Sequence, residues 1–274
     1  MGPKGGQVLG ELTEGARHDR LPLSLLKRKL LDQKFVVGTF LGIPSPAIVE
    51  LLGLGGFDFV VIDGEHSAID LKETEDLIRA GHSTQISVLV RVAKCDSHLI
   101  TQPLDMGAAG VQVPQIESPE MARMAVNAAK YHPLGSRGLQ PYVRSASYRA
   151  YGTDEYLAHA NEESLLVAQI EGKKGIDNLG SILKVEGLDI AFFGPYDLSQ
   201  SLGIPGEVRN PRVLEMVKSA IEIARNSGKY VGIYCDDAET AIEYRSIGVS
   251  YLTIGIDAGM FLTAARSLVR TLKS

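Results

Sequence analysis

A few polar residues that can do chemistry stand at the ends of short apolar runs in the sequence. They are Asp63, Glu65 and His66 after FVVI, Arg91 within VLVRV, Gln169 and Glu171 at the end of LLVAQIE, and Gly194, Pro195 and Asp197 after IAFF. Runs that are apolar throughout are typical of strands in a buried parallel sheet. Catalytic groups of barrel folds gather where such strands end, so we expect these side chains to share one site.

Glu171 and Asp197 form a pair of carboxylates with no histidine or cysteine near either of them in the sequence. Oxygen ligands alone suit a hard divalent cation, Mg²⁺ or Mn²⁺ with Co²⁺ as a further option, and such an ion keeps several waters. The open positions would accept a 2-keto acid through one carboxylate oxygen and the keto oxygen. The pair therefore predicts a metal site. Taken alone, either residue also fits the N-cap of the following helix.

Arg91 lies within an apolar run, so we expect it to be buried and to need partners. It would stabilise an enolate at the keto oxygen. Gly194 would let backbone N–H groups approach the substrate carboxylate. Histidine is the usual acid–base side chain of enzymes at neutral pH, and His66 would act in that way, with Asp63 orienting its ring. These residues predict enolate chemistry on a pyruvate-like molecule, which means an aldol or retro-aldol reaction, or decarboxylation of a 3-carboxy-2-keto acid.

A Schiff base to lysine is the alternative route within aldol chemistry. It would need a lysine that points into the barrel, and the predicted strands contain none. Lys94, just past VLVRV, is the one candidate, but the following Cys95 and Asp96 place it in a loop.

The elements that must position these residues alternate between strands and helices. The predicted strands are Phe35–Leu41, Phe59–Asp63, Val88–Val92, Gly110–Pro114, Leu165–Glu171, Ile190–Gly194, Tyr230–Tyr234 and Tyr251–Gly255. The clearest predicted helices are 46–54, 70–81, 119–130, 211–226, 237–247 and about 258–272. Eight strands with intervening helices predict a (β/α)₈ TIM barrel. An open doubly wound sheet is the alternative, but it would need a Gly-rich phosphate turn after the first strand, which is missing.

Residues 1–20 are predicted to be a flexible leader, and residues 21–274 a single barrel domain. One connection, at about 131–161, is unusually long and rich in arginine and tyrosine. Long connections of this kind are often lids or binding loops, and these residue types suit anionic substrates. A surface excursion or an oligomer contact is the alternative interpretation.

Composition limits the classes of partner. The 274 residues carry a net charge of −5, so no basic excess is present to bind nucleic acid. The two cysteines, Cys95 and Cys235, form no CxxC pair, which disfavours a disulfide framework or a thiolate zinc site and fits a reducing compartment. The sequence has neither an apolar run of about 18 residues nor a secretory signal, so we expect a cytoplasmic protein that does not bind membranes.

Six segments together resemble the HpcH/HpaI aldolase family. They are GFDFVVIDGEH (56–66), VRVAKCD (90–96), LDMGAAGVQVPQIES (104–118), LGSRG (134–138), LLVAQIEG (165–172) and FFGPYDLSQSLG (192–203). The order and spacing hold from about residue 24 to 272, and the combination of DGEH, QIE and GPxDLS makes the resemblance specific. It implies a barrel of the phosphoenolpyruvate/pyruvate type and a metal-dependent class II aldolase that joins pyruvate and an aldehyde in 4-hydroxy-2-keto acids.

The resemblance also implies roles for single residues. Glu171 and Asp197 match the metal ligands, and Arg91 matches the arginine on the keto oxygen. His66 with Asp63 matches the base that acts on the 4-hydroxyl. The other implied positions are Glu65 beside a metal-bound water, Gly194, Pro195 and Gln169 along the pyruvate site, and Asp105 at a contact that reaches a neighbouring subunit's active site.

Members of this family form hexamers, built as trimers of dimers that exchange the last helix. This chain departs from the family at Tyr196, where the aldolases usually carry alanine, and in YCDD (234–237) after the seventh strand. These two departures bear on the identity of the substrate portion other than pyruvate. Two alternatives stay open: an oxaloacetate-type decarboxylase similar to macrophomate synthase, and a non-catalytic barrel that binds a keto acid.

Overall fold

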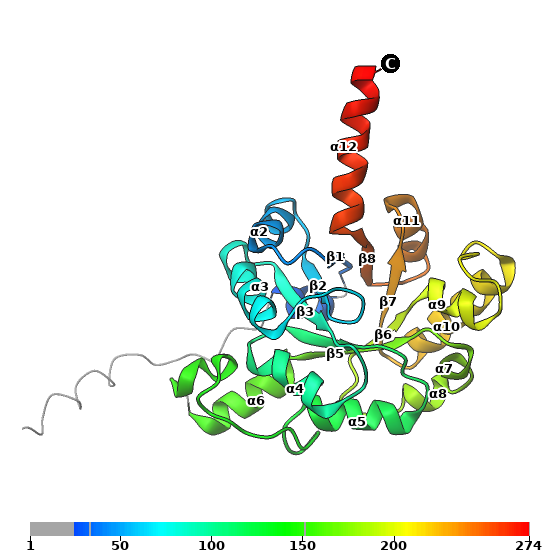
Figure 1. Ribbon diagram of the computed structural model, residues 1–274. Helices are drawn as coiled ribbons and strands as arrows, with labels where there is room; N and C mark the ends of the chain where they lie inside the picture. Colours follow the sequence, from blue (N-terminus) through cyan, green and yellow to red (C-terminus); the bar gives the residue numbers. More distant parts are fainter. Residues whose placement is uncertain (1–24, 33, 151, 274) are drawn as a thin grey trace, which may run out of the picture.

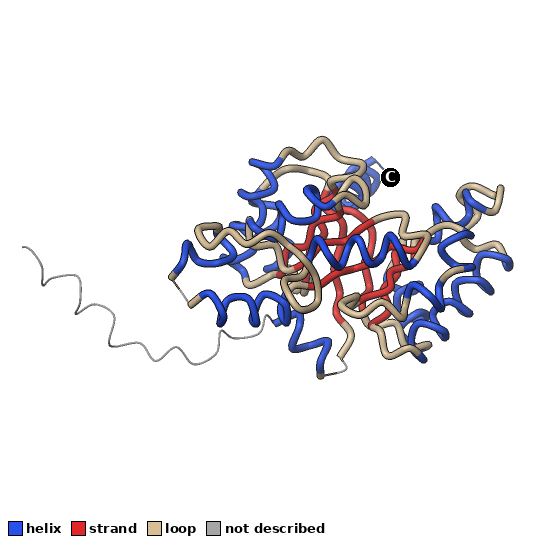
Figure 2. Tube along the Cα trace, turned by 90° about the horizontal axis from the view of Figure 1, so that it is seen from below, coloured by secondary structure: helices blue, strands red, loops and turns tan. Residues whose placement is uncertain are grey.

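The structure is a computed structural model that describes residues 25–32, 34–150 and 152–273. The predicted leader lies outside these residues. Eight parallel strands close into a barrel in chain order (Figures 1 and 2), which confirms the predicted (β/α)₈ fold. The strands are β1 (Val36–Leu41), β2 (Phe59–Asp63), β3 (Ser87–Arg91), β4 (Gly110–Val113), β5 (Leu165–Ile170), β6 (Ile190–Phe193), β7 (Tyr230–Cys235) and β8 (Tyr251–Ile256).

Helices surround the barrel, as the view from below shows (Figure 2). They are α1 (Leu25–Leu31), α2 (Pro46–Leu54), α3 (Leu71–Thr84), α4 (Ser97–Asp105), α5 (Pro119–Ala129), the 3₁₀ helix η1 (Arg144–Arg149), α6 (Thr153–Glu163), α7 (Lys173–Asp177), α8 (Leu179–Ile182), α9 (Pro195–Ser201), α10 (Pro211–Asn226), α11 (Ala238–Ser246) and α12 (Asp257–Lys273). No helix of the described ranges has the length and apolar composition needed to cross a membrane.

Aromatic residues fill the amino-terminal half of the barrel interior. The rings of Phe59 and Tyr251 stack with centroids 4.0 Å apart, and Phe192 packs edge-on against Tyr251. Gly38 is required beside them, because a Cβ at that position would lie 2.2 Å from the Phe59 ring. Leu26 of α1 joins the same buried cluster. The amino end of the barrel is therefore a packed core, which leaves the carboxyl end for chemistry.

Strand register brings polar residues together at the carboxyl end. Asp63 of β2 pairs with Arg91 of β3, and Arg91 pairs with Gln112 of β4. Gln169 of β5 pairs with Phe192 of β6, one residue before the end of either strand. Neighbouring strands therefore present acidic, cationic and amide side chains at one level of the barrel.

The long connection contains η1 and α6 and runs from the end of α5 to the start of β5. A segment that leads from a helix into the next strand lies near the amino ends of the strands. The long connection therefore lies at the end of the barrel opposite the predicted site residues. The arginines of the segment are engaged locally: Arg144 donates to the Met106 carbonyl at 3.0 Å, and Arg149 donates to the Tyr142 hydroxyl at 2.8 Å.

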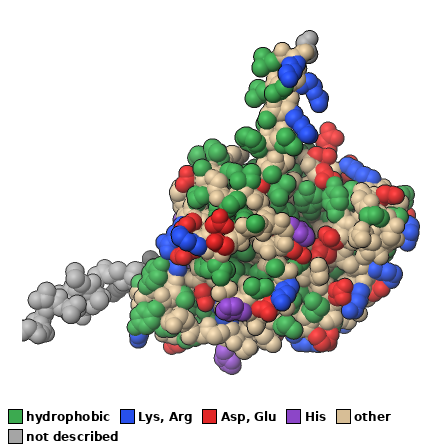
Figure 3. Space-filling view, viewed as in Figure 1, with side chains coloured by type: hydrophobic (Ala, Val, Ile, Leu, Met, Phe, Trp, Pro, Cys, Tyr) green, Lys and Arg blue, Asp and Glu red, His purple; other side chains and the backbone are tan. Residues whose placement is uncertain are grey.

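The last helix, α12, projects away from the barrel (Figure 1). Its first residue, Asp257, is buried, and its carboxylate accepts hydrogen bonds from the N–H groups of Gly42 and Ile43. Figure 3 shows apolar side chains along the projecting helix. Among the residues farther along, Phe261 is 75% exposed and Leu272 is 87% exposed. The helix thus presents an apolar surface that the barrel of the same chain does not cover.

Candidate active site at the carboxyl ends of the strands

Arg91 is buried and is held on two sides by acids. Its Nε donates to Asp63 Oδ1 at 3.0 Å, and its Nη2 lies 2.8 Å from Asp63 Oδ2. Its Nη1 lies 3.3 Å from Glu65 Oε2, and the Phe40 ring packs against the guanidinium with the centroid 4.5 Å from Cζ. Burial works to raise the pKa of Asp63, but Arg91 and two backbone N–H groups outweigh it, so the pKa lies below its usual value. The arginine is therefore held in one position by its partners.

The DGEH turn places Glu65 and His66 beside this pair. Asp63 Oδ1 accepts hydrogen bonds from the backbone N–H groups of Glu65 and His66, both at 3.1 Å. The His66 ring is largely exposed, and its Nε2 lies 3.8 Å from Glu65 Oε2. The expectation that Asp63 orients the His66 ring is not met, because both carboxylate oxygens of Asp63 are engaged elsewhere and Glu65 is the acid beside the imidazole. Burial raises the pKa of Glu65, although Arg91 opposes the shift.

A relay of amides holds Glu171. Gln112 Nε2 donates to Gln169 Oε1, and Gln169 Nε2 donates to Glu171 Oε2. A carboxylate can only accept hydrogen bonds, so Gln169 must turn its NH₂ group toward Glu171. Its amide oxygen then faces Gln112, which fixes the orientation of both amides. The second oxygen, Oε1, accepts from the backbone N–H of Gln115 at 3.0 Å. Gln115 has a φ of 54°, in the left-handed region that non-glycine residues seldom adopt. The unusual backbone conformation of Gln115 therefore accompanies a hydrogen bond that helps to hold the Glu171 carboxylate in place.

Gly194 lies between the two acids that were predicted as metal ligands. A Cβ built on Gly194 would be 2.9 Å from Glu171 Oε2 and 3.9 Å from Asp197 Oδ2. Pro195 follows as the first residue of α9, and the first turn of α9 carries Asp197. The structure thus brings Glu171, Asp197, Gly194 and Pro195 to one place.

The electrostatic environment of Glu171 and Asp197 suits a bound cation. Burial first, and then the charges of Asp197 and Glu65, raise the pKa of Glu171 to about 7, against the bonds from Gln169 and Gln115. Within the described ranges, no lysine or arginine forms an ion pair with Glu171 or Asp197. No cluster of three or more His, Cys, Asp or Glu side chains with metal-binding geometry occurs there either. Two carboxylates and no softer donor suit Mg²⁺ or Mn²⁺, with water completing the coordination.

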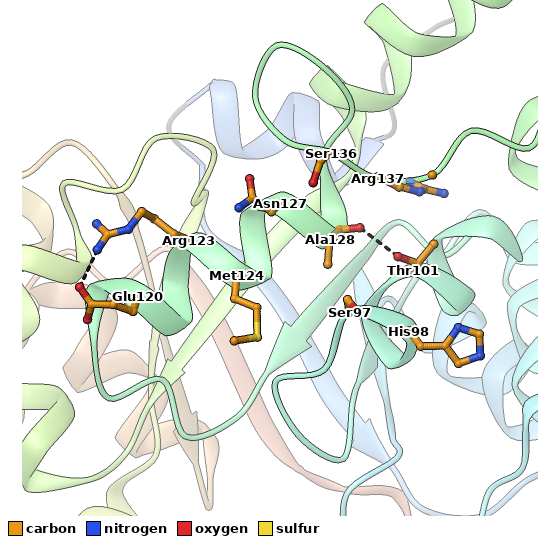
Figure 4. Close-up of a pocket in the computed structure, with 11 residues that line it drawn as sticks. Ser97, His98, Thr101, Glu120, Arg123, Met124, Asn127, Ala128, Ser136 and Arg137 are labelled. Carbon is orange, nitrogen blue, oxygen red and sulfur yellow. Dashed lines mark hydrogen bonds and ion pairs between the residues drawn. The ribbon is translucent and has the colours of Figure 1, made fainter.

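Asp105 does not reach this site in its own chain. It ends α4, and its carboxylate pairs with Arg137, whose guanidinium also packs over the Tyr131 ring. Arg137 lies at an open groove between α4 and α5 (Figure 4). Thr101 and Ala128 are joined across this groove by a hydrogen bond of 3.1 Å. The residues that line the groove include none of the predicted site residues, so we assign no catalytic role to it.

Sequence reasoning gave no role to three features of the site. Gln112 lies in the predicted strand Gly110–Pro114 and Gln115 directly follows it, but the bonds that connect both residues to Glu171 join strands that are far apart in the sequence. Phe40 was assigned simply to a strand. Tyr196 and Asp236 belong to the two segments that depart from the family, and the structure joins them by a hydrogen bond of 2.9 Å.

Comparison with known proteins places the chain among aldolases. The model of the HpcH/HpaI aldolase/citrate lyase family matches residues 37–264. A hydroxypyruvate/pyruvate aldolase from Deinococcus radiodurans is 36% identical over 253 residues, which cover 92% of this chain and 91% of that protein. A 2-keto-3-deoxy-L-rhamnonate aldolase from Salmonella gallinarum is 33% identical over 248 residues, 90% of this chain and 92% of the relative.

Similar solved structures include an aldolase, a citrate synthase and macrophomate synthase. The HpcH/HpaI aldolase from Desulfitobacterium hafniense has a TM-score of 0.87 and 33% identity, with 91% of this chain and 96% of that chain covered. The citrate synthase SbnG has a TM-score of 0.84 and 34% identity, with 92% and 98% covered. Macrophomate synthase, with a TM-score of 0.76 and 26% identity, matches over 90% of this chain and 91% of its own.

Proposed function

Because the chain belongs to the HpcH/HpaI aldolase/citrate lyase family, we propose that it is a metal-dependent class II aldolase that makes and breaks 4-hydroxy-2-keto acids through a pyruvate enolate. The observation that carries the proposal is the position of Gly194, against which the carboxylates of both Glu171 and Asp197 lie. This is the arrangement needed to hold one cation and to bring a keto acid beside it. The aldolase names of the relatives support the same reaction type.

Glu171 and Asp197 would hold a divalent cation, Mg²⁺ or Mn²⁺ with Co²⁺ as a further option. When bound, such an ion supplies a Lewis acid that polarises the keto group of a 2-keto acid. Gln169 and the backbone of Gln115 keep Glu171 in position for this role. Gly194 leaves room beside the two acids, and with Pro195 and Gln169 it lines the space for the pyruvate carboxylate.

Arg91 stabilises the charge that develops on the enolate oxygen. An arginine has five N–H donors. Asp63 and Glu65 engage three of them, which leaves one on each terminal nitrogen for the substrate. Because the guanidinium is fixed by its partners and shielded by the Phe40 ring, it needs little rearrangement in the transition state.

His66 accepts the proton of the 4-hydroxyl during cleavage. As that O–H bond breaks, the carbon–carbon bond between C3 and C4 breaks too, and C4 becomes the aldehyde carbonyl. The electron pair of the broken bond forms the pyruvate enolate, which then takes up a proton at C3 to give pyruvate. Glu65, 3.8 Å from Nε2, supports the protonated imidazole.

The exposed apolar surface of α12 supports an oligomer that exchanges this helix. Leu51 and Leu54 of α2 and Ile242 of α11 are also exposed, on the helices that follow β1 and β7. A helix after β8 would normally cover the space between those two helices. We propose that α12 of a neighbouring copy does so, in a hexamer in which Asp105 contacts a neighbour's active site.

The chain's own chemistry is consistent with a reducing compartment, since Cys95 and Cys235 are both free thiols. We propose a cytoplasmic location on that ground. A protein with this activity would take a 2-keto acid and an aldehyde as its small-molecule partners.

The direct test is carbon–carbon bond formation between pyruvate and an aldehyde panel, with and without EDTA. We expect chelation to abolish the reaction and Mg²⁺ or Mn²⁺ to restore it. Glu171→Gln and Asp197→Asn should both be inactive. Covalent labelling of a lysine by pyruvate and borohydride would contradict the metal route and support a Schiff base.

A further inference from the structure

Tyr196 and Asp236 form a hydrogen-bonded pair at the rim of the candidate site. The Tyr196 hydroxyl lies 2.9 Å from one oxygen of the Asp236 carboxylate and 3.1 Å from the other. Tyr196 directly precedes Asp197 in α9, whereas Asp236 directly follows β7. The pair therefore joins the turn that carries a predicted metal ligand to the end of the neighbouring strand. Both side chains are exposed, so a substrate can reach them.

Three aromatic rings connect this pair to Arg91, and we call them the aromatic wall: Phe40, Tyr234 and Tyr196. The Phe40 and Tyr234 centroids lie 6.1 Å apart, and those of Tyr234 and Tyr196 lie 5.9 Å apart. Phe40 in turn packs against Arg91. The wall thus runs from the arginine that faces the keto oxygen to the Asp236 carboxylate.

The far end of the wall is negatively charged. Asp236 and Glu243 line the small pocket beside Tyr196, together with Arg209. Arg209 is already engaged, with Nη2 2.8 Å from Thr240 Oγ1 and Nη1 3.5 Å from Glu243. Burial and the nearby Asp236 charge raise the pKa of Tyr234 to about 12, so this phenol stays neutral. The charge of Asp236 is therefore not balanced by an adjacent cation among the residues that line this pocket.

The polar side chains at the carboxyl ends of β2 to β5 are already packed against one another. Asp63, Arg91, Gln112 and Gln169 are buried there and bonded to one another or to the neighbouring acids. A keto acid held near Glu171 and Asp197 must therefore extend toward the aromatic wall, with His66 on the β2 side of its reacting carbon.

We propose that the aldehyde half of the substrate lies along the aromatic wall, and that Tyr196 and Asp236 select uncharged hydroxyaldehydes over aldehydes that carry a carboxylate. The inference rests on the proposed aldolase function. A hydroxyl group can donate to Asp236 or to the Tyr196 oxygen, and C–H groups can pack on the rings. A terminal carboxylate on the aldehyde would be repelled by the negative charge of Asp236 and has no hydrogen-bond donor to give to it.

The test uses the metal-loaded enzyme with pyruvate and two matched pairs of aldehydes. Glycolaldehyde is compared with glyoxylate, and 4-hydroxybutanal with succinic semialdehyde. The members of each pair differ only in a hydroxymethyl or a carboxylate terminus. We expect kcat/KM to favour the neutral member by about 10- to 100-fold, the size of a lost hydrogen bond to a charged group.

Substitutions test whether the aldehyde preference depends on Tyr196 and Asp236 or on a general disturbance of this region. Asp236→Asn should reduce the preference for the neutral member about tenfold, and Tyr196→Phe should lower kcat/KM for the hydroxyaldehydes alone. Asp237→Asn is the matched control, because Asp237 caps α11 through the Thr240 N–H at 2.7 Å and asparagine keeps that cap. A preference for the anionic members, or an unchanged preference in Asp236→Asn, would overturn the inference.

Exchange of the pyruvate methyl protons with D₂O shows which part has failed. This exchange reports enolate formation and needs no aldehyde. Absence of both exchange and turnover contradicts the aldolase function itself. If the exchange persists but the aldehyde preference is unchanged in Asp236→Asn, only the role of the aromatic wall is contradicted.

Discussion

Asp63 and Arg91, paired across β2 and β3, form a two-point ion pair, with Nε 3.0 Å from Oδ1 and Nη2 2.8 Å from Oδ2. Planar guanidinium and carboxylate groups match in this geometry, which a lysine cannot reproduce. Asp63 therefore sets the direction in which the remaining Arg91 donors point.

Arg91→Lys should keep a cation at the site but lose the fixed donors. We expect kcat to fall about 10²- to 10³-fold, as on removal of an oxyanion donor. Steady-state kinetics with saturating metal would measure it. Arg79→Lys is the matched control, since Arg79 pairs at the surface with Glu75 of α3 and with Tyr148 of the long connection. Full activity in Arg91→Lys would refute the role given to the guanidinium.

His66→Ala distinguishes aldol cleavage from decarboxylation. Aldol cleavage needs a base for the hydroxyl proton and should slow about 10²- to 10⁴-fold. Decarboxylation of oxaloacetate breaks a bond to CO₂ without that proton and should change only a few-fold. Both reactions can be followed by pyruvate release, with His98→Ala, at an exposed position in the first turn of α4, as the control. Equal losses in both reactions would show that His66 is not the hydroxyl base.

Gly194→Ala should block the metal site. The new Cβ would lie 2.9 Å from Glu171 Oε2, whereas a Cβ at Gly180 meets nothing within 4 Å. We expect Gly194→Ala to weaken Mn²⁺ binding at least tenfold in isothermal titration calorimetry, and Gly180→Ala to bind as the wild type does. Equal affinities would place the ion away from Gly194.

The pH dependence of metal stabilisation follows from Glu171. Its pKa of about 7 in the folded chain exceeds the usual 4.5. Between these values the folded protein holds a proton that the unfolded chain has lost. The stability that Glu171 contributes is therefore full below pH 4.5 and is lost by about pH 7, above which the buried carboxylate is ionised and opposes folding. A cation relieves that opposition only where Glu171 is ionised.

The rise in Tm on adding Mg²⁺ should accordingly be small at pH 6 and larger at pH 8. Thermal unfolding with and without the metal measures it, and Glu171→Gln should remove the metal response at both pH values. A larger response at pH 6 than at pH 8 would contradict this account.

The strands were predictable because both of their faces are buried. The prediction for β2 matches Phe59–Asp63 at both ends, and β6 differs only by the terminal Gly194. Helices without a clear pattern were missed. The helix α4 carries Pro103 in its interior, and α6 is largely polar, so neither gave a clear helical signal in the sequence.

The candidate residues could be identified, but their partners could not. The sequence paired Asp63 with His66 because they are neighbours in the chain. The structure pairs Asp63 with Arg91, which strand register places beside it. The Gln112–Gln169–Glu171 relay and the Tyr196–Asp236 bond likewise join different strands and loops. Such contacts depend on closure of the barrel, which no local pattern encodes.

The most direct measurement is a crystal structure of the protein with Mn²⁺ and pyruvate, with anomalous data collected at the manganese edge. The account predicts one anomalous peak bonded to the carboxylates of Glu171 and Asp197, with the keto oxygen of pyruvate within hydrogen-bond distance of Arg91. A peak at any other position, or pyruvate joined covalently to a lysine, would contradict it.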